Sequence, residues 1–336
     1  MTLQNTPASP LVLGAMSFGT LVDDDVSFAL LDRFVERGGV WIDTADCYSF
    51  WASDTGHGGA SESVIGRWLG ERPGVRTRVR LSTKVGAEPL WPGSWPEHRT
   101  GLSPRAIHQA VEGSLERLGV DMVDLLWLHQ EDRAVPIEQT VDGLASLTSR
   151  GTVARVGASN HPAWRIERAR AHAASIGSVP IDAFQLNSTY LRTRPGTLPP
   201  GVIHPFGVLS DEQRDFAVAN GLETWAYTPL LSGAYDNPAK SIPEVYEHPG
   251  TERRLAVLGR IADAHGVERG QVVLAWLLAH GIRPILGGSK LDQLDLAMDA
   301  AGIALAAEEI ADLDAPVWGG RGARALIAWS ACQLPL

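Results

Sequence analysis

Short apolar runs recur along the whole chain, and each is followed by a longer stretch in which apolar and polar residues alternate with helical spacing. Runs of five or six mostly apolar residues are typical of strands that are buried on both faces. Eight such runs predict strands at 11–16, 40–45, 79–84, 124–129, 154–159, 183–187, 223–227 and 283–288.

Amphipathic stretches between these runs predict helices, and several begin at a Ser, Thr or Asp that can cap the first turn. They are expected at about 24–38, 61–70, 104–118, 138–150, 162–175, 211–220, 251–265, 268–280 and 290–300. Regular alternation of strand and helix indicates a parallel sheet. Eight units favour one closed (β/α)8 barrel over residues 1–336. A doubly wound sheet is the alternative, but it would need a Gly-rich phosphate loop, and the chain has no GxGxxG.

Composition narrows the choice of partners and compartment. The chain has 44% apolar and 20% charged residues and a formal net charge of -10. No basic stripe is present, so a nucleic-acid partner is not expected. The only cysteines, Cys47 and Cys332, lack metal-ligand spacing, so we expect no metal site and a reducing cytoplasm. The N-terminus has no signal-peptide pattern, and no run suits a membrane span.

Long loops are predicted after several strands, where a barrel places its active site. They cover 46–60, 85–103, 188–210 and 229–250, and a tail at 315–336 follows the last helix. These segments are rich in Trp, Gly, Pro and His. We expect them to line a substrate pocket, with ordinary surface loops as the alternative.

Four ionisable residues stand at or just beyond the ends of the second, third and fourth predicted strands: Asp43, Tyr48, Lys84 and His129. Individually, each has a structural explanation, as a cap, a packed aromatic, a solvated strand end or a core histidine. In a barrel, however, the ends of successive strands converge. A phenol needs help to act as an acid near neutral pH. A lysine could stabilise the phenolate, the aspartate could hold the lysine, and the histidine could orient a carbonyl oxygen.

Several fragments follow one another in an order that resembles the aldo-keto reductase superfamily over nearly the whole chain. They are GAMSFG, IDTADCY, LSTKVG, SLERLGVDMVDLLWLH, RVGASN, FQLN, WAYTPLLSG and ILGGSKLDQL. The resemblance, most like a bacterial NADP-dependent member, implies a (β/α)8 barrel and a nicotinamide cofactor bound without a Rossmann fold. It also implies a catalytic tetrad at Asp43, Tyr48, Lys84 and His129.

The same resemblance implies a cofactor site. Ser159, Asn160 and Gln185 match residues that hydrogen-bond the nicotinamide carboxamide, and Tyr227 matches the aromatic that stacks on its ring. The remaining positions implied for the cofactor are Gly19, Leu230, Ser232, Gly233, Gly288, Ser289, Lys290 and Gln293.

Lys290 and Ser289 lie before a predicted helix, in the segment that binds the adenosine 2′-phosphate in relatives, and they favour NADP(H) over NAD(H). Leu296 and Ala297 depart from the family pattern, because many relatives carry Glu and Asn that contact the adenine at these positions. This departure leaves the adenine contacts and the cofactor preference open.

A second departure is the long segment after Tyr48. We expect Trp51, His57, Trp91 and Trp318 to reach the substrate, with packing within the loops as the alternative. Cys47 receives no role, because strand-like alternation would turn it away from the site.

The sequence therefore predicts a cytoplasmic NADPH-dependent reductase of an aldehyde, ketone or keto-sugar, with Tyr48 as the proton donor. A regulatory NADPH-binding subunit similar to the potassium-channel β subunits is the alternative. A barrel isomerase or hydrolase would need carboxylate pairs or metal ligands that the strand ends lack. Oligomeric state is left open.

Overall fold

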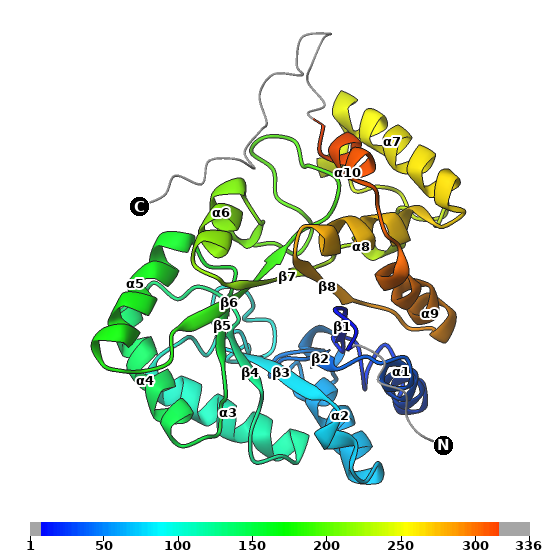
Figure 1. Cartoon of the computed structure of the whole chain (residues 1–336). Coiled ribbons are helices and arrows are strands. Elements are labelled where there is room, and N and C mark those ends of the chain that lie inside the picture. The colour runs from blue at the N-terminus through cyan, green and yellow to red at the C-terminus, as the bar shows by residue number, and fades with distance from the viewer. Residues whose placement is uncertain (1–7, 316–336) are drawn as a thin grey trace.

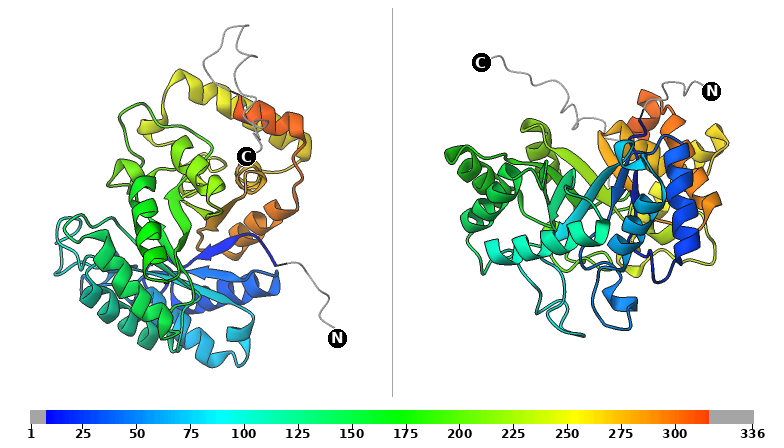
Figure 2. Two further views of the ribbon diagram at one scale, coloured as in Figure 1. Left: turned by 60° about the vertical axis from the view of Figure 1, so that its left-hand side comes forward. Right: turned by 90° about the horizontal axis from the view of Figure 1, so that it is seen from below.

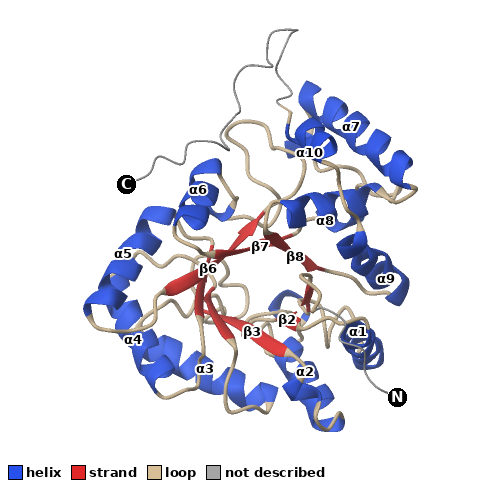
Figure 3. Cartoon of the chain, in the orientation of Figure 1, coloured by secondary structure: helices blue, strands red, loops and turns tan. Residues whose placement is uncertain are grey.

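The computed structural model describes residues 8–315, and in these the strands close into a parallel barrel in the order β1-β2-β3-β4-β5-β6-β7-β8. Figures 1 and 3 show the strands at the centre with the helices around them. The strands are β1 (Val12–Gly14), β2 (Trp41–Asp43), β3 (Arg80–Val85), β4 (Leu125–Leu128), β5 (Val156–Ser159), β6 (Ile181–Asn187), β7 (Glu223–Tyr227) and β8 (Ile282–Leu286). The predicted (β/α)8 barrel is confirmed, with each strand within a few residues of its expected position.

The helices alternate with the strands as predicted, and a second view of the ring is given in Figure 2. They are α1 (Asp24–Glu36), α2 (Ala60–Glu71), α3 (Pro104–Leu118), α4 (Ile137–Ser149), α5 (Ala163–Ser175), α6 (Asp211–Ala219), α7 (Pro249–His265), α8 (Arg269–Ala279), α9 (Leu291–Asp299) and α10 (Ala307–Asp314). The sequence patterns missed α10, because it has only eight residues and buries one leucine, Leu313. None of the helices among residues 8–315 is long and apolar enough to cross a bilayer.

Large aromatic side chains fill the inside of the barrel. The indole rings of Trp41 and Trp127 each lie edge-on to that of Trp225, with centroids 5.2 and 5.1 Å away. A Cβ on Gly157 would lie 2.3 Å from the Trp127 ring, so the neighbouring strand has room for glycine alone at that position. Since the interior is packed, the chemistry is confined to the ends of the strands.

Ion pairs join helices where the ring closes. Arg37, just after α1, binds Asp295 and Asp299 of α9 at 3.0 and 2.5 Å. Arg260 of α7 binds Asp312 of α10 at 2.6 Å, and these two helices lie side by side on the outside of the barrel (Figure 1). Such partly exposed pairs contribute roughly 0–1 kcal/mol each. Closure of the barrel therefore depends mainly on the apolar faces beneath them.

Parallel pairing in register brings the polar strand ends to one face. Gly14 of β1 is the register partner of Asp43 of β2, and Asp43 in turn is the partner of Ser82 of β3. Lys84, two residues further along β3, is the register partner of Trp127 of β4. The ends of β2, β3 and β4 thus lie together, as the placement of the ionisable residues requires.

Candidate active site

Asp43 and Lys84 form a buried ion pair at the carboxyl ends of β2 and β3. Lys84 Nζ donates to Asp43 Oδ2 at 2.5 Å and to the main-chain oxygen of Thr44 at 2.8 Å. The other carboxylate oxygen of Asp43 accepts from Ser82 Oγ at 2.6 Å and from Gln185 Nε2 at 3.3 Å. Burial lowers the pKa of Lys84, and the Asp43 carboxylate acts in the opposite direction. Each buried charge therefore has partners that fix its position.

Tyr48 and His129 complete the group of four. Tyr48 lies in the turn after β2, and its ring centroid is 5.8 Å from that of His129, which directly follows β4. Lys84 Nζ lies 4.5 Å from the centroid of the Tyr48 ring. Its hydrogen bonds go to Asp43 and Thr44, so its influence on the phenol is electrostatic. Burial, followed by the negative charge of Asp43, raises the pKa of Tyr48 well above its usual range.

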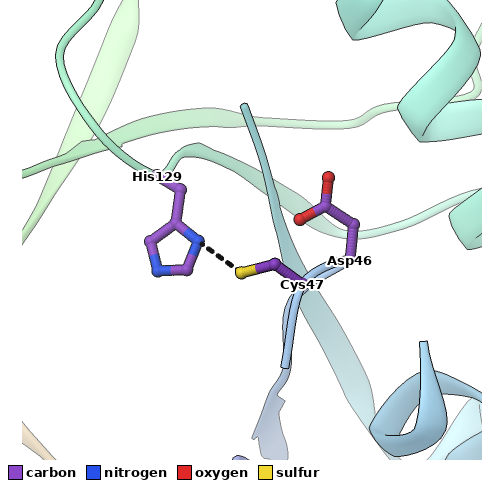
Figure 4. A group of neighbouring side chains, drawn as sticks. All are labelled: Asp46, Cys47 and His129. Atoms are coloured by element: carbon purple, nitrogen blue, oxygen red, sulfur yellow. Dashed lines mark hydrogen bonds between the residues drawn. The ribbon is translucent and has the colours of Figure 1, made fainter. Parts of the chain in front are cut away.

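Cys47 also faces this group, which corrects the expectation that it would be turned away. Its Sγ lies 3.4 Å from His129 Nδ1, as Figure 4 shows. The expectation failed because β2 ends at Asp43, so that Cys47 and Tyr48 lie in a turn where strand alternation no longer holds. Sequence patterns also did not single out Ser82 and Arg99. Ser82 donates a hydrogen bond to Asp43, and the charge of Arg99 helps to lower the pKa of His129.

Protonation of the Cys47–His129 pair follows from its surroundings. Burial raises the pKa of the Cys47 thiol well above its usual range, as do the nearby carboxylates of Asp46 and Glu88. Burial, with the charges of Lys84 and Arg99, lowers the pKa of His129 well below its usual range. A protonated thiol beside a neutral imidazole can donate to Nδ1, and the ring proton then lies on Nε2.

The residues expected to hold the nicotinamide lie at the ends of β5, β6 and β7 and form two separate sets of hydrogen bonds with the tetrad. Asn160 Nδ2 donates to the main-chain oxygen of His129 at 2.9 Å and to Ser159 Oγ at 3.0 Å. Tyr227 Oη donates to Asn160 Oδ1 at 2.8 Å. Gln185 belongs to a second set and donates to Asp43 at 3.3 Å. The candidate cofactor residues and the tetrad are thus directly linked.

The segment after β7 forms a tight turn at the expected pyrophosphate position. Leu231, Ser232 and Gly233 all have positive φ, at 49°, 57° and 92°, and Leu230 precedes them. The N–H groups of Leu231 and Gly233 donate to main-chain oxygens of the same segment, at 3.4 and 2.8 Å, and so stabilise the turn. Lys240 Nζ donates to the main-chain oxygen of Ser232 at 2.5 Å, which places a positive charge at the same turn.

Gly288, Ser289, Lys290 and Gln293 lie together at the start of α9, and all four are exposed. Lys290 is the N-cap residue and makes no capping bond with its side chain, whereas the N–H of Gln293 in the first turn donates to Asp292 Oδ1 at 2.8 Å. Gly19 lies elsewhere, in the turn after β1, where its φ of 76° and a Cβ approach of 2.8 Å to Val64 require glycine.

Leu296 and Ala297, the two residues that differ from the family pattern, lie further along α9. Leu296 is 39% exposed, whereas Ala297 is buried against the core. A buried Ala297 is therefore unable to present a side chain to an adenine, and Leu296 offers an apolar surface in its place.

A side-chain contact joins two of the long loops, those that follow β2 and β3. His57 Nδ1 lies 2.9 Å from Glu88 Oε1, which ties loop 46–60 to loop 85–103. Trp51 is half exposed and lies edge-on to Tyr48, with ring centroids 6.5 Å apart. The ring of Trp91 stacks instead on His98 of its own loop, at 4.9 Å. Trp318 and tail residues 316–336 lie outside the described residues.

The chain is similar to several known proteins over most of its length. The aryl-alcohol dehydrogenase of Pestalotiopsis microspora is 28% identical over 91% of this chain and 78% of its own length. Norsolorinic acid reductase A of Aspergillus parasiticus is also 28% identical, over 91% of this chain and 77% of its own. The crystal structure of a thermostable aldo-keto reductase in complex with the inhibitor epalrestat superposes with a TM-score of 0.69, at 24% identity, over 93% of this chain and 96% of that one. The model of the Aldo/keto reductase family matches residues 10–317. The chain belongs to the aldo/keto reductase family.

Proposed function

We propose that this protein is a cytoplasmic, NADPH-dependent reductase that converts an aldehyde, ketone or keto-sugar to the alcohol. The observation that carries the proposal is the fully buried Lys84–Asp43 ion pair, whose ammonium lies 4.5 Å from the centre of the Tyr48 ring. A packed barrel has no structural need for a charged pair at this depth, and buried ion pairs are weak contributors to stability. Perturbed ionisable groups that gather at strand ends mark a site of chemistry.

Tyr48 is the proton donor in this proposal. Burial keeps its phenol protonated, and the Lys84 ammonium offsets the negative charge that develops on the phenol oxygen as the proton leaves. Asp43 holds the ammonium in place. His129 donates from Nε2 to the carbonyl oxygen and so fixes its position next to Tyr48. When bound, a reduced nicotinamide supplies the hydride that the carbonyl carbon accepts.

The residues present fit such a cofactor. Ser159, Asn160 and Gln185 are buried at strand ends and offer hydroxyl and amide groups, which match the donors and acceptors of a carboxamide. The side chain of Asn187, at the end of β6, has a buried Nδ2 with no hydrogen-bond partner among the described residues. An amide donor left open here supports a polar ligand at the barrel mouth.

Lys290 supports the choice of NADPH over NADH. Lys290 provides a positive charge for a phosphate dianion, and the N-terminus of α9 favours the same anion. Lys290→Met should raise the KM for NADPH about tenfold or more, since bonds to charged groups contribute about 1.5–3 kcal/mol, and should leave the KM for NADH nearly unchanged. Lys240→Met is the matched control, because the turn that Lys240 contacts would hold the pyrophosphate common to both cofactors. Equal effects of Lys290→Met on both cofactors would contradict the assignment.

The substrate class is proposed from the relatives and from Trp51. An aryl-alcohol dehydrogenase and a norsolorinic acid reductase are named among the similar proteins, which favours aromatic carbonyl compounds. The half-exposed indole of Trp51, edge-on to Tyr48, provides an apolar wall beside the proposed acid. Aromatic aldehydes and ketones are therefore the first compounds to test, followed by keto-sugars.

The deciding experiment is single-turnover oxidation of bound NADPH by Tyr48→Phe. The substitution removes only the hydroxyl, and loss of a general acid should slow the chemical step roughly 10²–10⁴-fold. Tyr246→Phe is the matched control, because Tyr246 is also buried and its hydroxyl has no described hydrogen-bond partner. Full-rate hydride transfer by Tyr48→Phe would show that another group donates the proton. A wild-type protein that binds NADPH yet turns over no carbonyl would instead support the regulatory subunit.

A further inference from the structure

Three side chains of types that can bind a metal converge at the tetrad, and one of them, His129, belongs to it. Asp46 and Cys47 lie in the turn after β2, and His129 follows β4 (Figure 4). One potential ligand atom from each lies within 4.8 Å of the other two, and no other such group of His, Cys, Asp and Glu occurs between residues 8 and 315. Sequence spacing did not reveal this group, because its members come from two separate strand ends.

The distance between the soft ligands already suits one ion. Cys47 Sγ and His129 Nδ1 are 3.4 Å apart. Zinc bonds of about 2.3 Å to sulfur and about 2.0–2.1 Å to nitrogen, at a tetrahedral angle, place the two atoms roughly 3.6 Å apart. Only a few tenths of an ångström separate the observed geometry from that arrangement. The carboxylate of Asp46 has further to move.

Asp46 supplies an independent reason to expect a cation. Asp46 is only 5% exposed, and its Oδ1 has no hydrogen-bond partner among the described residues. The carboxylates of Glu62 and Glu88 act on Asp46 electrostatically, and Arg117 is the one cation among the described residues that acts in the opposite direction. A buried carboxyl that lacks a partner and faces two acidic neighbours is stabilised by a positive ion.

We propose that Cys47 Sγ, His129 Nδ1 and a carboxylate oxygen of Asp46 bind one Zn²⁺, with a water molecule as the fourth ligand. Thiolate, imidazole and carboxylate together suit zinc better than magnesium or calcium. On binding, the S–H bond of Cys47 breaks, its proton passes to solvent, and a Zn–S bond forms without any change of oxidation state. The two negative ligands balance the charge of the ion. Lys84 adds no net charge to this balance because it is paired with Asp43.

A zinc ion at this position should inhibit the reductase reversibly, and this consequence rests on the proposed function. A dication beside Tyr48 favours the phenolate, which has no proton to donate. Zinc would thus act as an inhibitor that a chelator removes. Binding of the ion itself does not depend on the identity of the substrate or on turnover.

The test uses the full-length protein, untagged, reduced and treated with chelator, with Co²⁺ as a spectroscopic probe. One equivalent of Co²⁺ should produce the near-ultraviolet charge-transfer band of a thiolate–cobalt bond, and Zn²⁺ should abolish the band by displacement. Cys47→Ser should remove the band and weaken Zn²⁺ binding in equilibrium dialysis about tenfold or more. Cys332→Ser, at the only other cysteine, should change neither.

Asp46→Asn provides a second variant that keeps the thiol. It should retain the cobalt band and weaken Zn²⁺ binding, because the carboxylate ligand is lost. Absence of the band in the wild-type protein, or its persistence in Cys47→Ser, would overturn the site. If Zn²⁺ bound at Cys47 without slowing the reaction, the site would stand and the inhibition through Tyr48 would be wrong.

Discussion

Separating Asp43 from Lys84 should have an unusually large effect on stability. In Asp43→Asn, the Lys84 ammonium stays buried with the main-chain oxygen of Thr44 as its remaining described acceptor. Breaking a buried ion pair from one side costs about 3–5 kcal/mol, because an uncompensated charge remains. Lys84→Met should cost less, about 1–3 kcal/mol, since the Asp43 carboxylate keeps its bonds from Ser82 and Gln185.

The double variant isolates the interaction. Asp43→Asn together with Lys84→Met removes both charges, so its loss of stability should be smaller than the sum of the single losses by roughly 1–3 kcal/mol. Urea unfolding followed by far-ultraviolet circular dichroism gives the three free energies of unfolding. All three variants should be severely impaired in carbonyl reduction, because each removes a group that supports Tyr48 in the proposed mechanism.

The pH dependence of Asp43→Asn gives a further check. Burial already lowers the pKa of Lys84, and removing Asp43 takes away the largest opposing effect and leaves only those of Cys47 and Asp46. When the pKa of Lys84 is lower in the folded than in the unfolded protein, stability is lost as the pH falls from the unfolded to the folded value. The destabilisation caused by Asp43→Asn should therefore shrink as the pH rises above neutrality. Single losses below about 1 kcal/mol that simply add would refute the reasoning, since they would show that the pair is not energetically coupled.

Two further predictions concern positions away from the tetrad. Gly66→Ala in α2 should destabilise the protein by about 1–3 kcal/mol, because its Cβ would lie 2.1 Å from the main-chain oxygen of Arg117. Gly70→Ala, four residues along the same helix with no atom within 4 Å of the new Cβ, should stabilise it by about 0.5–1 kcal/mol, and urea unfolding compares the two. His161 is fully buried, and burial lowers its pKa to about 4. Between about pH 6.5 and 4, His161 is therefore protonated in the unfolded chain but not in the folded one, so the free energy of unfolding falls as the pH falls. His161→Asn, which can keep the bond to the Ser159 carbonyl, should flatten that decline in unfolding free energy, and an unchanged slope would place the titration elsewhere.

The barrel could be predicted because its signals are local. Each strand needed a buried run of residues, and each helix needed an apolar face, so both were visible as periodic patterns along the chain. Helix α3 is the clearest case, with Ser103 as its cap, Pro104 in the first turn and Gly119 at its end. Helix α10 escaped detection because eight residues around one buried leucine carry too little periodicity.

The residue types at the strand ends were enough to predict that Asp43, Tyr48, Lys84 and His129 form one group. The structure places these four side chains together. Their proposed roles remain for experiment. Prediction failed at Cys47, whose direction depends on where β2 stops and the turn begins. That boundary is set by packing against neighbouring strands and cannot be read from a period of two.

By itself, the sequence determined the order of the strands and of every helix except α10, and it placed ionisable residues at consecutive strand ends. Only the tertiary structure decided that Lys84 binds Asp43 while facing the ring of Tyr48, and that Cys47 and Asp46 lie beside His129. The reason is physical: hydrophobic periodicity is a property of one segment. Distances between ligand atoms and the burial that shifts a pKa arise when several segments close on one another.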